Sequence, residues 1–359
     1  MTGPDPDTFA ELLCDWCLEV QPGQQVLIGM SLESLPLVRA LHAALLERGA
    51  WALPRPALFA ADFYRHARPE QLDSFPSLDL ADAQGADALL RIDAPVNTMA
   101  LAGVDPELVQ RVARARQPIQ QARLARRWCT TIWPTAALAQ QARMSEEDYA
   151  AFVRRALLLD QGGPLEAWRT LSLSQTRLIE RLAGAREVRI EAEGTDLRLR
   201  VDGRTWINSD GRRNMPSGEV FTGPLEGSAD GTIRFTIPSS PRGVEVRGVE
   251  LTFEAGRVTA ARAEAGEDYL EAALATDAGA RFLGELGIGT NTGIDRPTGS
   301  ILLDEKIAGT VHLALGRSYP ETGGTNTSAL HWDLICDLRS GGRLSVDGQV
   351  VNEDGHFVQ

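Results

Sequence analysis

Lysine is nearly missing from this chain of 359 residues, because Lys306 is the single lysine among 36 basic residues. A net charge of −13 leaves no excess of cations to replace phosphate counterions, so a nucleic-acid partner is not expected. No apolar run approaches the roughly 18–20 residues of a membrane helix. The first residues carry acids and prolines instead of the basic and apolar stretches of a signal peptide. These absences predict a cytoplasmic protein with no nucleic-acid or membrane partner.

Cysteines and cofactor-binding motifs are scarce as well. Cys14 and Cys17 have the spacing of a redox pair, but they fall within a helical pattern of apolar residues, so we expect them to pack in a core. No glycine-rich phosphate loop follows the apolar stretch 25–30, which argues against nucleotide binding. Neither a G-x-S-x-G motif nor a cysteine–histidine signature supports a covalent mechanism.

The lone lysine is informative because arginine replaces lysine everywhere else. Arginine carries a wide planar fork, whereas lysine carries a compact ammonium group on a slim stem. A site too narrow for the fork would explain why Lys306 is retained, and chance survival of one lysine is the alternative.

The first half of the chain alternates short apolar segments with amphipathic ones. Strands are expected at 25–30, 51–58 and 88–92, and helices at 32–48 and 106–116. This alternation predicts an α/β domain with a mostly parallel sheet flanked by helices. A helical stretch from 145 to about 182 leads out of this domain, which we place at residues 1–183.

After residue 184 the chain changes to short segments in which apolar and polar residues alternate, as in strands with one buried face. Strands are expected at 188–192, 197–201, 232–237, 244–253, 257–263, 310–315 and 330–338, and one amphipathic helix at 267–283. The second domain, residues 184–359, is therefore predicted to be a β-rich α+β domain.

Two histidines of the second domain suggest a metal site. His331 and Asp333 form an H-x-D motif, and residues two apart on a strand point to the same face. His312 lies in the middle of an apolar strand, where a plain core would favour an aliphatic residue. Lys306 precedes it by an even number of residues, so an unbroken strand would place it on the same face. A hydrogen-bonded core histidine is the simpler interpretation of His312 alone, but imidazoles beside a carboxylate suit a divalent metal.

Two glutamates of the same domain lie in unusual segments. Glu219 follows Pro-Ser-Gly, which shapes an irregular backbone, and Glu285 lies between glycines just past the expected helix. Each glutamate by itself could be a solvated loop residue, but together they would complete a carboxylate–histidine set.

The residues singled out above, with Tyr319, lie in four segments: 214–224, 283–291, 304–319 and 324–333. Their order of Glu, Glu, His, Tyr and His-x-Asp closely resembles that of the aminopeptidase T / aminopeptidase S family of metallopeptidases. The resemblance extends weakly into the first half of the chain. Agreement in all four segments is not expected by chance.

The resemblance implies a dinuclear metal centre in a homodimer that removes the N-terminal residue of small peptides. The implied metal ligands are Glu219, Glu285, His312, His331 and Asp333, with Tyr319 beside the ions. Zinc or cobalt would be the favoured ions, ahead of manganese or magnesium. Glu219 or Glu285 would relay a proton to the leaving amine, and Tyr319, helped by Lys306, would stabilise the oxyanion. The first domain would wall the cleft and contribute to the dimer contact.

Two other functions stay open from the sequence. His312, His331 and Asp333 by themselves form the two-histidine, one-carboxylate set of mononuclear iron(II) oxygenases. The 2,5-dihydroxypyridine dioxygenases cleave an aromatic ring. They resemble these aminopeptidases and would use such a set of ligands. The two glutamates favour two metals over this mononuclear site. A non-catalytic protein that binds peptide or metal is the remaining alternative.

Overall fold

The computed structural model describes residues 3–57 and 60–358. They form two compact units, one comprising the chain up to Trp168 with Gly211–Pro216, the other comprising Arg169–Asp210 and the chain from Ser217 onward. The division falls inside one helix, α10 (Pro164–Leu182), whereas the sequence pattern predicts a boundary near residue 183. A helix that continues across a boundary gives no stop signal there, so its periodicity cannot mark the division.

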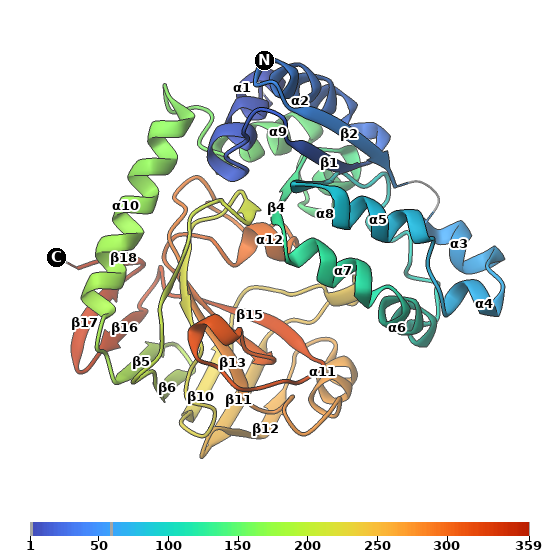
Figure 1. The fold of residues 1–359 in the computed structure, drawn as a ribbon. Helices are drawn as coiled ribbons and strands as arrows, with labels where there is room; N and C mark the ends of the chain where they lie inside the picture. The colour runs from blue at the N-terminus through green and yellow to red at the C-terminus, as the bar shows by residue number, and fades with distance from the viewer. Residues whose placement is uncertain (1–2, 58–59, 359) are drawn as a thin grey trace. The chain divides into compact units, whose positions relative to one another are not determined.

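The N-terminal unit is built on a five-stranded parallel sheet with the strand order β2-β1-β3-β4-β8 (Figure 1). Its strands are β1 (Gln25–Met30), β2 (Trp51–Pro56), β3 (Ala88–Asp93), β4 (Arg127–Ile132) and β8 (Asn214–Met215). Its helices are α1 (Pro6–Leu12), α2 (Leu35–Glu47), α3 (Ala60–His66), α4 (Pro69–Leu72), α5 (Ser77–Gly85), α6 (Pro106–Ala115), α7 (Gln117–Leu124), α8 (Ala136–Gln141) and α9 (Glu146–Ala156). The predicted parallel α/β fold is confirmed.

Most elements expected in this unit are present. The strand expected at 51–58 corresponds to β2 as far as Pro56, and Leu58 lies outside the described residues. The helix expected at 32–48 begins with a 3₁₀ turn and continues as α2, which buries one apolar stripe at helical spacing. Cys14 and Cys17 are buried thiols in a π-helical turn after α1, as expected for core residues.

The cap of α1 gives a stability prediction for this unit. Asp5 precedes the helix, and its carboxylate accepts hydrogen bonds from the Thr8 amide at 3.0 Å and the Thr8 hydroxyl at 2.7 Å. Replacing Asp5 by alanine should lower the free energy of unfolding by about 1 kcal/mol, because a helix-terminal amide loses its partner. Chemical denaturation measures this loss. Asp7→Ala, on an exposed residue of the first turn, is the matched control and should change stability by less than about 0.5 kcal/mol. An equal loss in both variants would contradict the capping role.

The C-terminal unit contains two antiparallel sheets. The larger, sheet B, has the order β12-β11-β10-β6-β5-β16-β17-β18, and the smaller, sheet C, has the order β15-β14-β13-β9-β7. Sheet B is formed by β5 (Glu187–Ala192), β6 (Thr195–Arg200), β10 (Asp230–Phe235), β11 (Val249–Glu254), β12 (Arg257–Arg262), β16 (Arg343–Val346), β17 (Gln349–Glu353) and β18 (His356–Phe357). Sheet C is formed by β7 (Ile207–Ser209), β9 (Glu219–Thr222), β13 (Leu283–Gly289), β14 (Thr310–Gly316) and β15 (His331–Asp337).

Helices are few in this unit. Beside the later part of α10, the α-helices among its described residues are α11 (Glu267–Leu274) and α12 (Ile301–Asp304). The predicted β-rich α+β fold is confirmed. Among the described residues no helix, α10 with its 19 residues included, is both long and apolar enough to cross a membrane.

The prediction of a helix at 267–283 is wrong for its second half. α11 ends at Leu274, and Asp277 then accepts hydrogen bonds from the amides of Gly279 and Ala280, which closes a turn. The chain from Leu283 onward forms β13, at the centre of sheet C. Apolar residues at helical spacing cannot reveal this change, since a short apolar strand and a helix segment share the same composition.

Sheet C has one apolar face and one polar face, because side chains alternate along a strand. The apolar face packs in the core of the unit, where its side chains are at most 6% exposed. These core residues are Val220, Leu286, Ile288, Val311, Leu313, Leu315, Trp332, Leu334 and Cys336. The residues that alternate with them form the polar face.

Candidate metal centre

The polar face of sheet C brings together side chains from strands far apart in the sequence. Directly opposed residues of neighbouring strands point to the same face. Ala314 of β14 is opposed by Glu285 of β13 on one side and by Asp333 of β15 on the other. His331, two residues before Asp333, shares this face. The small side chain of Ala314 therefore leaves a space that is bordered by two carboxylates and an imidazole.

Two glycines of β13 make room for the rest of the cluster. His312 is opposed by Gly287, and Glu219 is opposed by Gly289. A Cβ atom at Gly287 would lie 2.0 Å from the imidazole of His312, and one at Gly289 would lie 2.0 Å from a backbone carbonyl oxygen. Only glycine fits at both positions, and it has low strand propensity. The need for space at the site thus explains why β13 does not look like a strand in the sequence.

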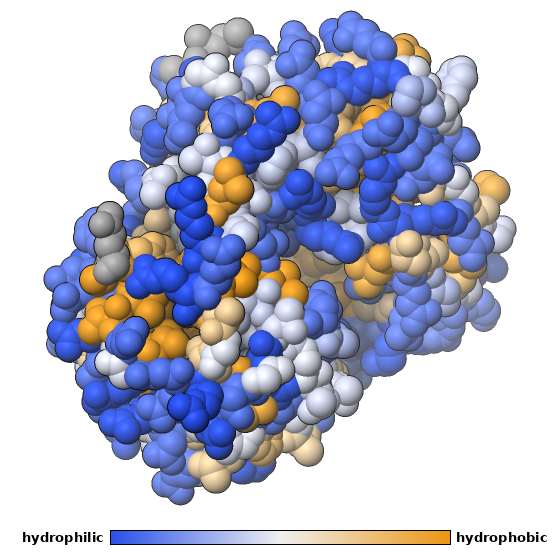
Figure 2. Space-filling view, turned by 60° about the vertical axis from the view of Figure 1, so that its left-hand side comes forward, coloured by the Kyte–Doolittle hydropathy of each residue, from blue (hydrophilic) through white to orange (hydrophobic). Residues whose placement is uncertain are grey.

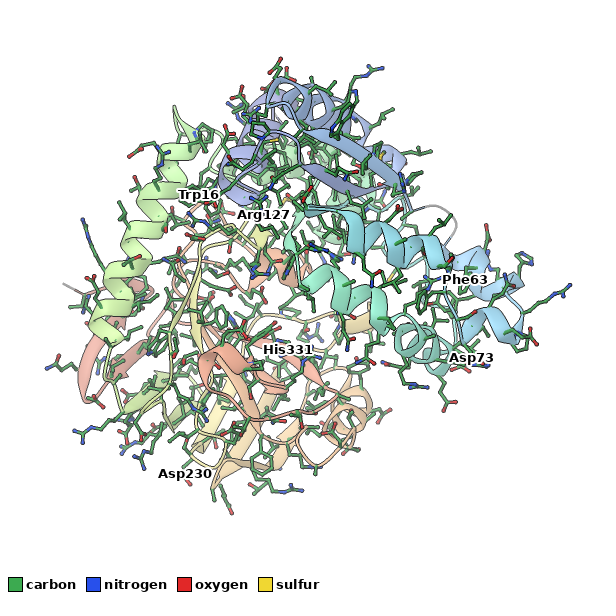
Figure 3. All side chains as sticks on the ribbon, viewed as in Figure 1. Trp16, Phe63, Asp73, Arg127, Asp230 and His331 are labelled. Atoms are coloured by element: carbon green, nitrogen blue, oxygen red, sulfur yellow. The ribbon has the colours of Figure 1, made fainter. Side chains whose placement is uncertain are left out.

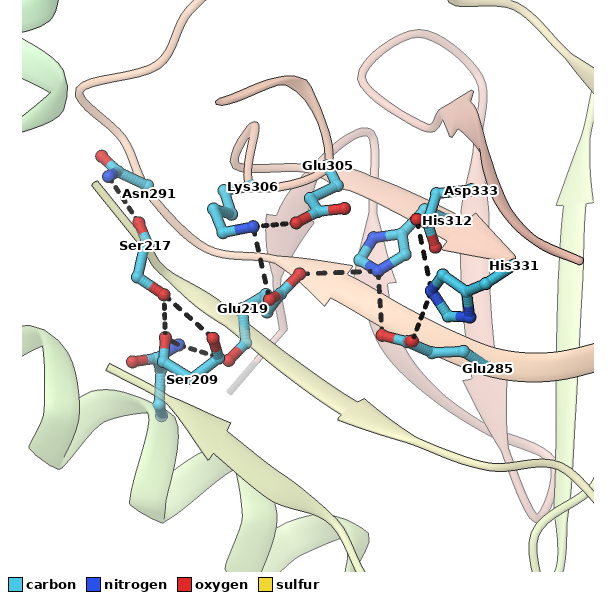
Figure 4. Close-up of polar contacts among 11 residues, drawn as sticks. Ser209, Ser217, Glu219, Glu285, Asn291, Glu305, Lys306, His312, His331 and Asp333 are labelled. Carbon is cyan, nitrogen blue, oxygen red and sulfur yellow. Dashed lines mark hydrogen bonds and ion pairs between the residues drawn. The ribbon is translucent and has the colours of Figure 1, made fainter. Parts of the chain in front are cut away.

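The backbone before β9 sets the position of Glu219. Gly218 has φ +118°, and a Cβ atom there would lie 2.7 Å from that of Asn291. Asn291 Nδ2 donates to the carbonyl oxygen of Ser217 at 2.7 Å, and Gln175 Nε2 donates to that of Glu219, also at 2.7 Å. Glu219 is 5% exposed, so its carboxylate is directed into the unit (Figure 4).

Lys306 reaches the cluster from a turn, which corrects its expected place on the strand of His312. It follows α12, four residues before β14 begins. Asp304 anchors this turn by accepting hydrogen bonds from the amide and hydroxyl of Thr298 at 2.7 and 2.8 Å. Lys306 Nζ lies 3.4 Å from Glu219 Oε1 and pairs with Glu305, and its side chain is fully buried.

Glu305 was not predicted as a site residue. Its carboxylate is 16% exposed and joins Glu219 and His312 within the cluster. It precedes the only lysine of the chain and lies within the segment 304–319, and these were the signals available in the sequence.

The two histidines both turn Nε2 towards Glu285. His312 Nε2 lies 3.4 Å from Glu285 Oε1, and His331 Nε2 lies 3.6 Å from Oε2 of the same carboxylate. His331 Nδ1 lies 2.8 Å from the carbonyl oxygen of Arg317, to which it donates, and this leaves Nε2 as the ligand atom. The side chain of His331 is partly buried, at 16% exposed, and Figure 3 labels it together with Asp230, which lies at the periphery of the C-terminal unit at the start of β10.

Burial and charge act in opposite directions on the pKa values of the cluster. Burial raises the pKa values of the Glu219 and Glu285 carboxyls. Burial by itself would lower the pKa of His312, but the hydrogen bond to Glu285 and the charge of Glu219 outweigh it and raise that pKa to about 9. The charge of Asp333 likewise outweighs burial at His331 and raises its pKa to about 10. The carboxylates thus draw protons to the cluster, and a metal cation could replace that positive charge.

Tyr319, which the family resemblance implies beside the ions, lies at the edge of the cluster. Its ring packs edge-on against the imidazole of His331, with 5.3 Å between centroids, and against Phe221 at 5.6 Å. Burial and the charge of Glu285 raise the pKa of its hydroxyl, so this group keeps its proton. Tyr319 remains 38% exposed and can meet a molecule that enters from solvent.

The donor atoms suit divalent metal ions. Glu219, Glu305 and His312 bring one ligand atom each within 4.8 Å of one another, and Glu285, His312 and Asp333 do the same. Four carboxylates, each at most 16% exposed, face a single ammonium group. Among the described residues Glu219 Oε2 and His312 Nδ1 are buried without a hydrogen-bond partner, which is costly. Oxygen and imidazole ligands with an excess of negative charge fit borderline divalent ions.

The buried position of Lys306 gives a stability prediction. Lys306→Arg should lower the free energy of unfolding by about 1–3 kcal/mol, because the wider fork has no free space in a side-chain site that is 0% exposed. Chemical denaturation checks this. The reverse exchange on an exposed strand, Arg262→Lys, is the control and should change stability by less than about 0.5 kcal/mol. Equal stability of Lys306→Arg and the parent protein would refute a site too narrow for arginine.

Known proteins share both the sequence and the fold. A family described as thermophilic metalloprotease (M29) matches residues 5–357. Over 97% of its length the chain is 32% identical to Aminopeptidase 2 of Geobacillus stearothermophilus, and the match covers 94% of that protein. It is 29% identical to Aminopeptidase T of Thermus thermophilus, with 97% and 95% covered. The solved structure of wild-type AmpT from Thermus thermophilus has a TM-score of 0.86 at 24% identity, over 99% of both chains.

Proposed function

Because this chain belongs to the thermophilic metalloprotease family M29 and is a metallo-aminopeptidase, we propose that it removes the N-terminal residue of peptides at the carboxylate–histidine cluster, with two divalent metal ions bound there. The observation that carries the proposal is that His312 belongs to two different groups of possible metal ligands, formed by side chains of sheet C and by Glu305 from the turn after α12. A cluster of this size exceeds the two histidines and one carboxylate of a mononuclear iron site.

The ligands would divide between two ions. Those proposed for one ion are Glu219, Glu305 and His312, and those proposed for the other are His331 and Asp333. Glu285 would contribute to holding both ions, because its two oxygens face different histidines at 3.4 and 3.6 Å.

The chain's own residues would handle the proton and the oxyanion. When bound, divalent ions of this kind act as Lewis acids that lower the pKa of water and polarise a peptide carbonyl. Glu219 or Glu285 would accept the proton of the attacking water and deliver it to the leaving amine. The protonated hydroxyl of Tyr319 would donate a hydrogen bond to the developing oxyanion. Lys306 is buried against Glu219 and Glu305 and would orient these carboxylates without touching the substrate.

The remaining features of the proposal follow from the family. The substrate class is a small peptide with a free N-terminus, and the named relatives are aminopeptidases. We propose zinc or cobalt as the ions, ahead of manganese or magnesium, since imidazole and carboxylate together suit borderline ions. A homodimer in the cytoplasm is the proposed working state.

Metal content and activity should be measured on the same preparation. We expect close to two ions per chain, together with release of leucine from a leucine anilide after addition of cobalt or zinc. A chelator should stop this hydrolysis. A single bound iron without hydrolysis would favour a ring-cleaving dioxygenase, and a protein without bound metal would be a non-catalytic binding protein.

A further inference from the structure

A pocket of about 300 Å³ adjoins the proposed metal centre, and all of its lining residues belong to the C-terminal unit. His331 and Asp333, two of the proposed ligands, form part of this lining. Their side chains are 16% and 12% exposed, so both keep surface that a molecule can contact. The volume is at the lower end of the roughly 300–1,000 Å³ of small-molecule sites, which suits a single amino-acid side chain.

The pocket follows β15, the last strand of sheet C, from the two ligands as far as Ile335. Residues two apart on a strand point to the same face, so Ile335 continues the row of His331 and Asp333. Ile237 forms an antiparallel bridge with Ile335, and its amide donates to the carbonyl oxygen of Ile335 at 3.3 Å. This hydrogen bond holds the segment 237–241 beside the strand, where it forms a wall of the pocket.

A further wall comes from the turn at 299–304. The Oδ1 atom of Asp304 accepts hydrogen bonds from the amide and hydroxyl of Thr298, and its Oδ2 atom accepts one from the Gly299 amide at 2.8 Å. Both oxygens of this carboxylate are thus engaged. Since Asp304 is also only 3% exposed, it offers little to a charged ligand. Ile301, in contrast, is 45% exposed and can contact a molecule that enters.

Apolar side chains supply most of the lining that the metal ligands do not. They are Ile237, Pro238, Pro241, Ile301, Trp332 and Ile335. The indole Nε1 of Trp332 donates to the hydroxyl of Ser239 at 3.0 Å, so this polar pair is satisfied within the lining. On the face of the protein shown in Figure 2, by comparison, most of the surface is hydrophilic. The pocket therefore suits a group that is apolar and that begins beside the carboxylate–histidine cluster.

We propose that this pocket receives the side chain of the substrate's N-terminal residue and selects aliphatic side chains such as that of leucine. The inference rests on the proposed aminopeptidase function. In a peptide the side chain branches from the Cα atom between the free amine and the carbonyl group that is attacked. Both groups would lie at the ions, so the side chain would begin beside His331 and Asp333. It would then contact Ile237, Ile301 and Ile335.

Aminoacyl anilides test this selection on the metal-loaded protein. kcat/KM should be at least about tenfold higher for the leucine anilide than for the glycine anilide, because burial of an aliphatic side chain favours the bound state. Titration calorimetry with the free amino acids gives a second measurement that does not depend on turnover. Leucine should bind at least about tenfold more tightly than glycine.

A variant at the exposed position of the pocket tests its location. Ile301→Asp introduces a carboxylate that disfavours an aliphatic side chain and attracts an ammonium group. The ratio of kcat/KM for the leucine anilide to that for the lysine anilide should therefore fall by about tenfold or more. Leu173→Asp, a similar exchange on an exposed residue of α10 that does not line the pocket, should leave this ratio unchanged.

The outcomes separate this inference from the proposed function. Hydrolysis with equal kcat/KM and equal affinity for the leucine and glycine compounds would overturn the inference and leave the aminopeptidase function intact. An unchanged leucine-to-lysine ratio in Ile301→Asp would do the same. If the protein with bound metal hydrolysed no anilide, the proposed function would fail and this inference would fail with it.

Discussion

Glu285→Gln is expected to abolish peptide hydrolysis while leaving the fold intact. The substitution keeps the volume of the side chain but removes its charge and replaces one of the two oxygens that face His312 and His331 with an amide nitrogen. A group that both binds ions and moves a proton is lost, so kcat/KM should fall by at least about 10²–10⁴. Steady-state hydrolysis of a leucine anilide and metal content per chain are the measurements. Circular dichroism should match that of the parent protein, which would show that the fold is intact.

Two further variants sharpen this result. Glu254→Gln, the same exchange on an exposed residue of β11, should retain full activity. His331→Ala should lose turnover as Glu285→Gln does, because its Nε2 faces both Glu285 and Asp333. Parent-like activity in Glu285→Gln or His331→Ala would remove the cluster as the active centre.

Removal of the metal ions is expected to abolish activity and to lower the melting temperature as well. Without cations the four carboxylates of the cluster are compensated only by the ammonium group of Lys306 and by the protons that they draw to His312 and His331. Ions that bind the folded state alone stabilise it by about 4 kcal/mol when their concentration is a thousand times the dissociation constant. Dialysis against a chelator should therefore shift thermal unfolding to lower temperature, and added cobalt or zinc should restore both stability and activity.

The cluster variant serves as the control for this experiment. Glu285→Gln has one charge less at the site, so the chelator should shift its melting temperature by less than that of the parent protein. Unchanged activity of the parent protein after treatment with the chelator would contradict a metal-dependent active centre. An equal shift in both proteins would mean that the stabilising ions bind elsewhere.

Local patterns in the sequence predict the fold class of both units, although they miss β4, β7, β8, β9, β13 and the C-terminal strands β16, β17 and β18. Alternating apolar segments predict the parallel sheet of the N-terminal unit, and period-two patterning predicts β14 and β15 with their histidines. The sequence likewise predicts the types of ligand residue and their order along the chain. It predicts His312, His331 and Asp333, which one face of sheet C brings together with Glu285.

Tertiary structure alone decides how the site is assembled. β13 forms because its neighbours β9 and β14 pair with it, and its glycines, which weaken a strand locally, leave the space that the imidazole of His312 fills. Glu305 and Lys306 join from a turn that long-range packing places beside Glu219. The register between strands and the contacts of turns depend on residues distant in the chain, and no local pattern records them.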